Sequence, residues 1–395
     1  MSAAAGSFSI PLPLRPSPLR LDVPLLLTAL GLLALGLVIL ASASIGIAEG
    51  LHDQPLFFLK RQLQAIALGA LGAAFMLAVP TSVWEHTGPA LLLFGLALLA
   101  LVLIPGVGNT VNGSTRWVNV AGIGVQVSEP ARLALILYIA GYAVRQQAVL
   151  RTRFVGLLKP VIILSLAAAL LLLEPDFGAA TVLLLTAMTM LFVAGARFRD
   201  MAFFAVAGIA AFAVLAFGTE YRKDRMIGFM DPWSDPYGNG FQLIQSLMAI
   251  GRGEWFGVGL GDGVQKLFYL PEAHTDFVFA VFAEEFGLLG VVALMALLLF
   301  FVLRILRVSR QAADSGMWFQ AYVVVGIGAW LGLQAFINIG VNAGILPTKG
   351  LTLPLISYGR SSIIIVMTAI GLVLRIHHEV SGASVLAKPR KGKRT

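Results

Sequence analysis

The chain has 395 residues, of which 58% are hydrophobic and only 12% are charged. Soluble domains carry about 25% charged residues, so this composition excludes an ordinary soluble protein and indicates a polytopic membrane protein. The chain contains no cysteine, which excludes disulfides and thiolate metal sites. Its net charge of +8 does not indicate nucleic-acid binding, because the basic residues flank apolar segments instead of clustering on a soluble domain.

Residues 1–20 form a Pro- and Ser-rich segment without apolar periodicity, and we expect a disordered tail there. The apolar segment from Val23 to Leu40 exceeds the roughly 7–15 residues of a signal-peptide core, so we interpret it as a retained first span. Apolar runs near the roughly 20 residues required for crossing predict about ten transmembrane helices. They lie at about residues 22–44, 57–79, 88–105, 127–145, 158–173, 177–195, 200–218, 277–303, 318–345 and 359–377.

These spans predict an all-α polytopic fold in which residues 21–378 form one transmembrane domain. An even number of spans places both ends on one side, and the bias of Lys and Arg toward that side makes it cytoplasmic. The basic tail at residues 379–395 is typical of a topology anchor, with contact to anionic lipid as an alternative. The long loop at residues 219–276, between spans seven and eight, is then extracytoplasmic, and we expect an interfacial helix near residues 241–250.

The unusual polar clusters all fall in the outer half of this topology. They are NGSTRWV at residues 112–118, SEPARL at 128–133, EPDFG at 174–178, LPEAHTDFVFAVFAEEFG at 270–287 and LPTKGLTLPLISYGRSS at 346–362, with Arg222, Lys223 and Arg225 in the long loop. Ionisable groups at a membrane span are costly and usually mark function. The chemistry is therefore expected on the outer face.

The charges in these clusters suit a phosphorylated substrate, because cations stabilise developing negative charge. The cations are Arg116, Arg132, Lys349 and Arg360. The carboxylates Glu129, Glu174 and Asp176 could pair with them or hold a divalent cation through oxygen ligands. The alternative, in which Glu129 and Glu174 only form ion pairs with buried arginines, stays open.

Asp276 stands where the long loop meets an apolar run. In a helix Glu284 would follow about 12 Å along the axis, beyond the roughly 5–9.5 Å of a glycosidase carboxylate pair. A lone carboxylate suits the removal of a proton from an attacking sugar hydroxyl, although Asp276 could instead cap the helix. Glu272 and His274 are loop candidates, and Glu285 points nearly opposite Asp276, where it could pair with a basic residue elsewhere.

Taken in order, these motifs resemble the SEDS (shape, elongation, division, sporulation) family over about residues 20–378, with the division branch most similar. The resemblance implies a ten-span peptidoglycan glycosyltransferase that polymerises lipid II, with a divalent cation, Mg²⁺ or Mn²⁺, in support. It makes Asp276 the catalytic residue. Family-invariant charges fall on Arg116, Glu129, Glu174, Asp176 and Lys349.

The resemblance also implies partners and a location. The partners are a class B penicillin-binding protein (the septal transpeptidase FtsI), the FtsQ-FtsL-FtsB activator complex, membrane lipid and the growing glycan strand. The location is the division septum of the bacterial inner membrane. Two residues depart from the family pattern: Arg132 replaces a lysine, and Arg360 replaces the second glycine of YGGSS.

Together with these residues, the resemblance implies an inverting glycosyltransferase. Asp276 would deprotonate the acceptor 4-hydroxyl, and the cations, with Ser361 and Ser362, would bind the undecaprenyl diphosphate leaving group. The alternatives are a lipid II flippase, which would require polar groups through the full membrane depth, and a scaffold for division proteins.

Overall fold

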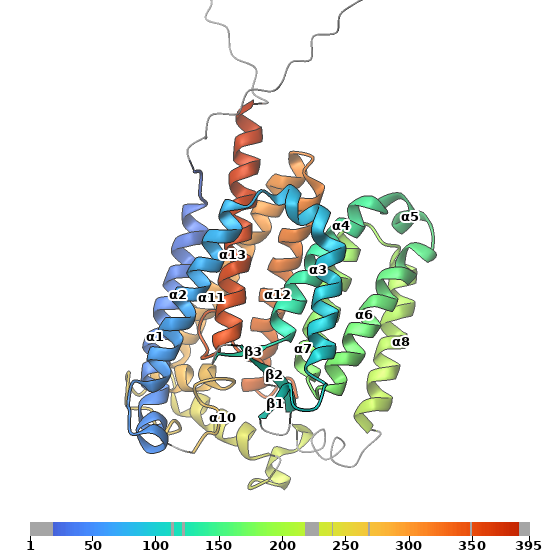
Figure 1. Ribbon diagram of the computed structural model, residues 1–395. Coiled ribbons are helices and arrows are strands. Elements are labelled where there is room, and N and C mark those ends of the chain that lie inside the picture. The colour runs from blue at the N-terminus through green and yellow to red at the C-terminus, as the bar shows by residue number, and fades with distance from the viewer. Residues whose placement is uncertain are drawn as a thin grey trace, which may run out of the picture.

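The computed structural model is a bundle of long helices with a small sheet at one end (Figure 1). It describes residues 19–386 except 112–113, 121–122, 218–228, 239, 268 and 348–349. The helices are α1 (Val23–His52), α2 (Phe57–Ala78), α3 (Thr81–Leu101), α4 (Ser128–Arg145), α5 (Gln147–Thr152), α6 (Val155–Leu173), α7 (Phe177–Val193), α8 (Phe198–Phe217), η1 (Pro232–Ser234), α10 (Phe241–Arg252), α11 (Val278–Asp314), α12 (Trp318–Asn342) and α13 (Arg360–Leu386).

The helices confirm an integral membrane protein. Within the described residues, seven are long and apolar enough to cross a membrane: α1, α2, α3, α6, α11, α12 and α13. The helix α7 is a shorter apolar helix. The helices α4 and α8 stand where the sequence predicts the fourth and seventh spans. The total of ten crossings stays a prediction.

Burial separates a central pair of helices from a lipid-facing periphery. The helix α12 is mostly buried, and nearly every residue of α4 from Ser128 to Ala143 is buried. Peripheral helices instead expose apolar side chains, such as Leu71 and Leu93, each 68% exposed. Outward-facing leucines are expected where lipid replaces water as the surrounding solvent.

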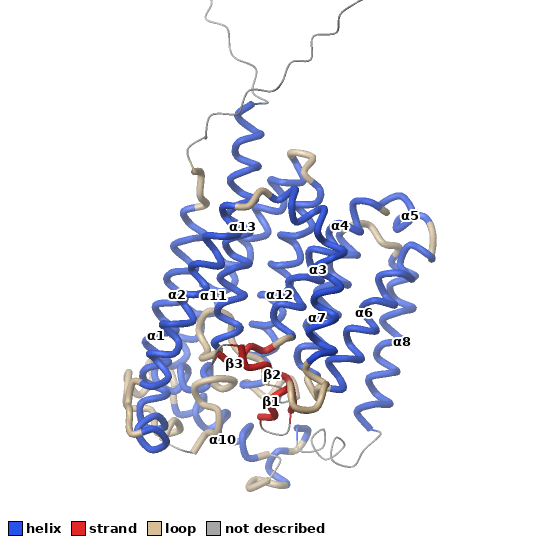
Figure 2. Tube along the Cα trace, viewed as in Figure 1, coloured by secondary structure: helices blue, strands red, loops and turns tan. Residues whose placement is uncertain are grey.

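A three-stranded antiparallel sheet lies at the end of the bundle near α10, as Figure 2 shows. Its strands, in the order β1-β2-β3, are β1 (Gly108–Val111), β2 (Ser114–Val120) and β3 (Ile123–Gln126), with Trp117 opposite Gln126. The sequence alone indicates only a polar cluster in this region. The helical fold class is confirmed, and the sheet is an addition to it.

Both described ends of the chain lie at the opposite end of the bundle (Figure 1). The backbone N–H of Arg20 donates to Nδ1 of His378 at 3.2 Å, which ties the start of α1 to the last turns of α13. This arrangement fits an even number of crossings. The helix α13 continues to Leu386, past the predicted domain boundary at residue 378.

The long loop is partly helical and supplies backbone hydrogen-bond partners at a break in α11. The predicted helix near residues 241–250 is α10, and it packs its apolar face against α11 and α12. At Gly287 the α11 backbone leaves helical geometry, with φ 63° and ψ −167°. Loop residues 254–259 take over the hydrogen bonds that the helix loses: Leu288 donates to the Glu254 carbonyl at 2.8 Å, and Val258 donates to the Glu284 carbonyl at 3.0 Å. The loop therefore fixes the short helical segment that follows Asp276.

Candidate active site

Asp276 lies just before α11, and its side chain does not cap the helix. The N-cap position belongs to Phe277, which makes no side-chain capping hydrogen bond. The neighbouring hydroxyl of Thr275 donates to the Glu272 carboxylate at 2.7 Å and is also not a cap. The capping alternative for Asp276 is therefore wrong.

Two buried asparagines of α12 hold the backbone of Asp276. The Nδ2 atoms of Asn338 and Asn342 donate to the Asp276 carbonyl oxygen at 2.9 and 3.0 Å. The Oδ1 atom of Asn342 also accepts from the backbone N–H of Ala280 at 3.2 Å. Both asparagines are almost completely buried, so these hydrogen bonds cannot be exchanged for water at low cost. Asp276 thus starts from a fixed backbone position.

The same face of α12 also holds the loop that leads into α13. Gln334 donates to the Thr352 carbonyl at 2.9 Å, and Asn338 donates to the Leu351 carbonyl at 2.5 Å. This loop is buried, and its Leu355 has a positive φ of 66°. A Cβ atom added at Gly36 of α1 would lie 2.6 Å from the Leu355 carbonyl oxygen, so only glycine fits there. Side chains of α12 thus satisfy the backbone of this buried, non-helical segment, as burial away from water requires.

Arg116 and Asp176 come together beside Asp276. Arg116, on β2, forms an ion pair with Asp176 at 3.6 Å, and Gln126 of β3 donates to the same carboxylate at 3.1 Å. Asp176 is also the N-cap of α7, accepting from the Ala179 N–H at 2.9 Å. A Cβ atom added at Gly350 would lie 2.9 Å from Asp276 Oδ2 and 3.9 Å from Arg116 Nη2. The carboxylate and the guanidinium therefore face the same small volume.

The environment of Asp276 raises the pKa of its carboxyl to about 7 from an ordinary value of 3.8. Burial is the main cause, the charge of Glu272 adds to it, and the charge of Arg116 opposes it. A general base works best when its pKa lies near the operating pH. Asp276 meets this requirement at neutral pH.

Glu174 is a second carboxyl with a displaced pKa. It ends α6, is completely buried, and neither of its carboxylate oxygens has a hydrogen-bond partner among the described residues. Burial and the nearby charge of Asp176 raise the pKa of Glu174 to about 8, although Arg116 opposes the shift. Glu174 forms no ion pair within the described part of the chain, in contrast to the ion-pair alternative.

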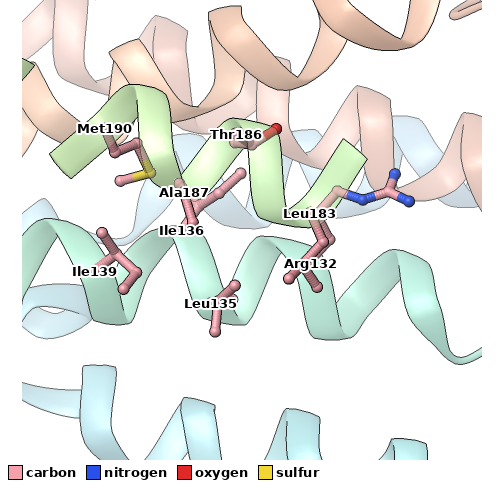
Figure 3. A pocket seen from close by; sticks show the side chains of 8 residues that line it. All are labelled: Arg132, Leu135, Ile136, Ile139, Leu183, Thr186, Ala187 and Met190. Carbon is pink, nitrogen blue, oxygen red and sulfur yellow. The ribbon is translucent and has the colours of Figure 1, made fainter. Parts of the chain in front are cut away.

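Glu129 and Arg132 pair with each other inside α4, at 3.4 Å. Arg132 is 1% exposed, donates to Gln334 Oε1 at 3.3 Å and lies over the Trp330 ring at 5.3 Å. Figure 3 shows Arg132 beside an otherwise mostly apolar pocket between α4 and α7, which Asp276 does not line. The ion-pair alternative describes Glu129 well.

The end of the α12–α13 loop is tied to the sheet. Ser361 accepts from the Gln126 N–H at 2.9 Å and donates to the Gly124 carbonyl at 3.2 Å, while Ser362 accepts from Thr352 at 3.2 Å. Both serines are thus engaged within the protein. Arg360 begins α13 beside Gly124, and Lys349, with Arg222, Lys223 and Arg225, lies outside the described residues.

The acidic pair of α11 forms a separate cluster. Glu285 pairs with Lys266 at 2.5 Å and accepts from Ser42 of α1 at 2.6 Å. Glu284 pairs with Arg252 at 3.4 Å and accepts from the Val264 N–H at 2.9 Å. These contacts bind the long loop to α11.

His274 is buried rather than solvated, with an exposed fraction of 8%. It packs between the rings of Phe58 and Tyr358, and its burial lowers the pKa of the imidazole. Its carbonyl accepts from the Tyr358 N–H at 2.9 Å. His274 therefore connects Asp276 to the start of α13.

Among the described residues, no three acidic or histidine side chains form a group that could hold a metal ion alone. Mg²⁺ usually binds through one or two carboxylates and completes its shell with water and substrate phosphates. The unpartnered oxygens of Glu174, beside Asp176, fit that smaller requirement.

Comparison with known proteins then decides the family. A family model described as "Cell cycle protein", for FtsW, RodA and SpoVE, matches residues 23–382. The chain belongs to this family. Two relatives in the FtsW/RodA/SpoVE family are named probable peptidoglycan glycosyltransferase FtsW. The protein from Thioalkalivibrio sulfidiphilus is 53% identical over 91% of this chain and 90% of its own length, and that from Methylococcus capsulatus is 50% identical over 94% and 93%.

Solved structures of the FtsW/RodA/SpoVE family have the same fold. A chain from a peptidoglycan synthase complex that coordinates polymerization and crosslinking matches with a TM-score of 0.75 and 32% identity, covering 92% of this chain and 99% of its own. The rod shape determining protein RodA from Thermus thermophilus matches with a TM-score of 0.68 and 30% identity, over 92% and 99%.

Sequence reasoning missed several residues around Asp276. Gln334, Asn338 and Asn342 recur every four residues on an otherwise apolar helix, so helical spacing could have identified a polar stripe. Arg61 and Gln62 of α2 were also missed, because more than 200 residues of sequence separate them from Asp276. Only the fold brings α2 against α13.

Proposed function

We propose that the chain is a peptidoglycan glycosyltransferase that polymerises lipid II on the outer face of the bacterial inner membrane, with Asp276 as general base. The observation that carries the proposal is a carboxyl with a pKa of about 7, facing Arg116 and fixed through its backbone by Asn338 and Asn342. The names of the relatives support the same activity.

Asp276 takes the proton from the 4-hydroxyl of the acceptor sugar. The oxygen then attacks the anomeric carbon of the donor, and the bond to the diphosphate breaks with its electron pair, so the anomeric configuration inverts. The diphosphate leaves as an anion that requires positive charge rather than a proton. Arg116 is placed to supply part of that charge. Since both substrates are polyprenyl-linked, holding them in one orientation supplies much of the acceleration.

Glu174 and Asp176 are the residues that would hold a Mg²⁺ or Mn²⁺ ion. The bound ion would supply further positive charge toward the leaving diphosphate.

We extend the proposal to partners and location. A class B penicillin-binding protein such as the septal transpeptidase FtsI would crosslink the product, since a related chain comes from a complex that coordinates polymerization with crosslinking. The FtsQ-FtsL-FtsB complex would activate the pair at the septum. Both ends of the chain would lie in the cytoplasm.

The test is lipid II polymerisation by the purified protein with its transpeptidase partner. Wild type should form glycan strands, and Asp276→Asn should form none while remaining bound to the partner. Asp314→Asn, which removes an exposed carboxylate from the opposite end of α11, is the matched control and should polymerise normally. Full activity of the Asp276→Asn variant would remove Asp276 as the base.

A further inference from the structure

The end of the bundle opposite to Asp276 carries a basic cluster on the side of α5, α6 and α8 (Figure 1). Residues 146–159 run from the end of α4 into α6, and residues 194–200 join α7 to α8. Together the two segments contain five cations and one carboxylate, which are Arg151, Arg153, Lys159, Arg197, Arg199 and Asp200. Half of the net charge of +8 therefore lies in these two short segments.

The single carboxylate does not neutralise the cluster. Asp200 is buried, pairs with Arg197 at 2.6 Å and lies 3.9 Å from Arg199. Within the described residues, the exposed Arg153 and Lys159 form no ion pair. Arg and Lys are the side chains that bind phosphate groups, through charge-assisted hydrogen bonds. Arg153 and Lys159 are thus available to an anionic ligand.

Side chains of the cluster fix the turn that carries Arg153. Arg197 donates to the Thr152 carbonyl at 3.0 Å, and Arg151 donates to the Ala194 carbonyl at 3.5 Å. These two hydrogen bonds run in opposite directions between the α5–α6 turn and the α7–α8 turn. They hold the two turns together without using Arg153.

The start of α6 is fixed from the other side as well. The buried Tyr142 of α4 donates through its hydroxyl to the Gly156 carbonyl at 2.7 Å. A Cβ atom added at Gly156 would lie 2.7 Å from the Val149 backbone, so α5 and α6 pack closely there. A ligand that binds to a turn already held in place loses little free energy in ordering it.

An apolar surface adjoins the cations. Phe154 and Val155 follow Arg153 directly, and Val155 is 64% exposed. The Phe154 ring stacks on Phe204 of α8 at 5.3 Å between centroids and meets Phe203 edge-on at 6.0 Å. Exposed apolar side chains next to unpaired cations match a ligand whose phosphate is attached to acyl chains.

We propose that Arg153 and Lys159 form a binding site for the phosphate of an anionic phospholipid, whose acyl chains lie along the exposed sides of α6 and α8. Arg151 supplies a further positive charge in the same turn. The bound lipid connects the α5–α6 turn to α8, whose residues 205–210 are all exposed. The site is separate from the proposed catalytic centre. Positive charge at this end also determines topology, which requires cations but no binding site, and the experiment separates the two roles.

The experiment measures lipid binding by native mass spectrometry of the purified protein in neutral detergent. Phosphatidylglycerol is titrated, with phosphatidylcholine as the neutral reference. Arg153→Gln and Lys159→Gln should each weaken phosphatidylglycerol binding about fivefold, as expected for one cation near a membrane surface. The double variant should weaken it about twentyfold, whereas Lys159→Arg should bind nearly as wild type does. Phosphatidylcholine binding should not change in any of them.

The matched control is the double variant Arg307→Gln, Arg310→Gln, which removes the same charge from exposed positions near the same end of α11. It should bind phosphatidylglycerol as wild type does. Equal weakening in this control would overturn the site, because the cations would then act only through the overall charge of this end. Unchanged binding in the Arg153→Gln, Lys159→Gln variant would overturn it too.

A soluble headgroup tests whether the acyl chains take part. Glycerol phosphate should bind far more weakly than phosphatidylglycerol, and equal affinity for both would overturn the assignment to a lipid. Lipid II polymerisation does not enter these measurements. Failure of the lipid site therefore leaves the proposed function unchanged, and failure of the proposed function leaves the lipid site unchanged.

Discussion

The displaced pKa of Asp276 predicts how the stability of the protein depends on pH. The folded-state pKa of about 7 exceeds the ordinary value of 3.8 by about 3 units. One unit corresponds to about 1.36 kcal/mol, so full burial would cost about 4 kcal/mol once the carboxyl is ionised. Asp276 keeps partial exposure, and solvent screening reduces the expected cost to about 1–3 kcal/mol.

The sign follows from proton linkage. The folded state holds the Asp276 proton more tightly than the unfolded state, so stability falls as pH rises from about 4 to about 7 and is level above that. Asp276→Asn has no proton to lose. Its stability relative to wild type should therefore increase across this window and stay constant from pH 7 to 9.

The assay is the midpoint of thermal unfolding of both proteins in the same nanodiscs, at one heating rate, from pH 5 to 9. Lipid II polymerisation by wild type, measured over the same range, should rise with pH around a midpoint near 7, because the base acts only when ionised. A stability difference independent of pH, with a rate midpoint near 4, would refute the reasoning.

Three further predictions concern the surroundings of Asp276. The pKa of Glu174 is about 8 in the folded protein and 4.5 ordinarily, so wild type loses stability as this carboxyl ionises between pH 5 and 8. The stability of Glu174→Gln relative to wild type should therefore increase over this range and then level off. A difference in thermal unfolding midpoint that does not change with pH would contradict this. Lys266→Met should lower the free energy of unfolding by about 3–5 kcal/mol by leaving Glu285 unpaired, and adding Glu285→Leu should recover most of it in denaturation assays. Gly287→Ala should cost more than about 1 kcal/mol, because φ is positive and its Cβ would meet the loop backbone at 2.3 Å, whereas Gly31→Ala, with open space, should cost nothing in the same scan.

Much of the fold could be predicted from apolar runs alone. Each predicted span coincides with a helix, and α1 begins at Val23, one residue from its predicted start. This works because a helix is the only single segment that satisfies its own backbone in lipid. The sheet was missed because its strands are short and carry polar residues between β-branched ones, a weak signal beside the helical spans.

The candidate site was predictable in composition and not in geometry. Polar motifs such as the one around Asp276 are easily recognised in a chain of which only 12% of the residues are charged. Which charges neutralise each other depends on contacts between distant segments, as with Arg116 and Asp176 or Lys266 and Glu285. The sequence also predicts Ser361 and Ser362 beside the substrate, which stays a prediction, and the structure adds that both hydroxyls bond to other parts of the protein.

The break in α11 at Gly287 makes two distant segments share one set of hydrogen bonds. Residues 254–259 of the loop and residues 284–289 of the helix each complete the other's backbone. Neither segment can exchange its amide hydrogens without exposing the other, so the two form one cooperative unit in local opening. Any force that displaces the loop acts on the helical turns behind Asp276, while the membrane-spanning part of α11 beyond the break can stay still.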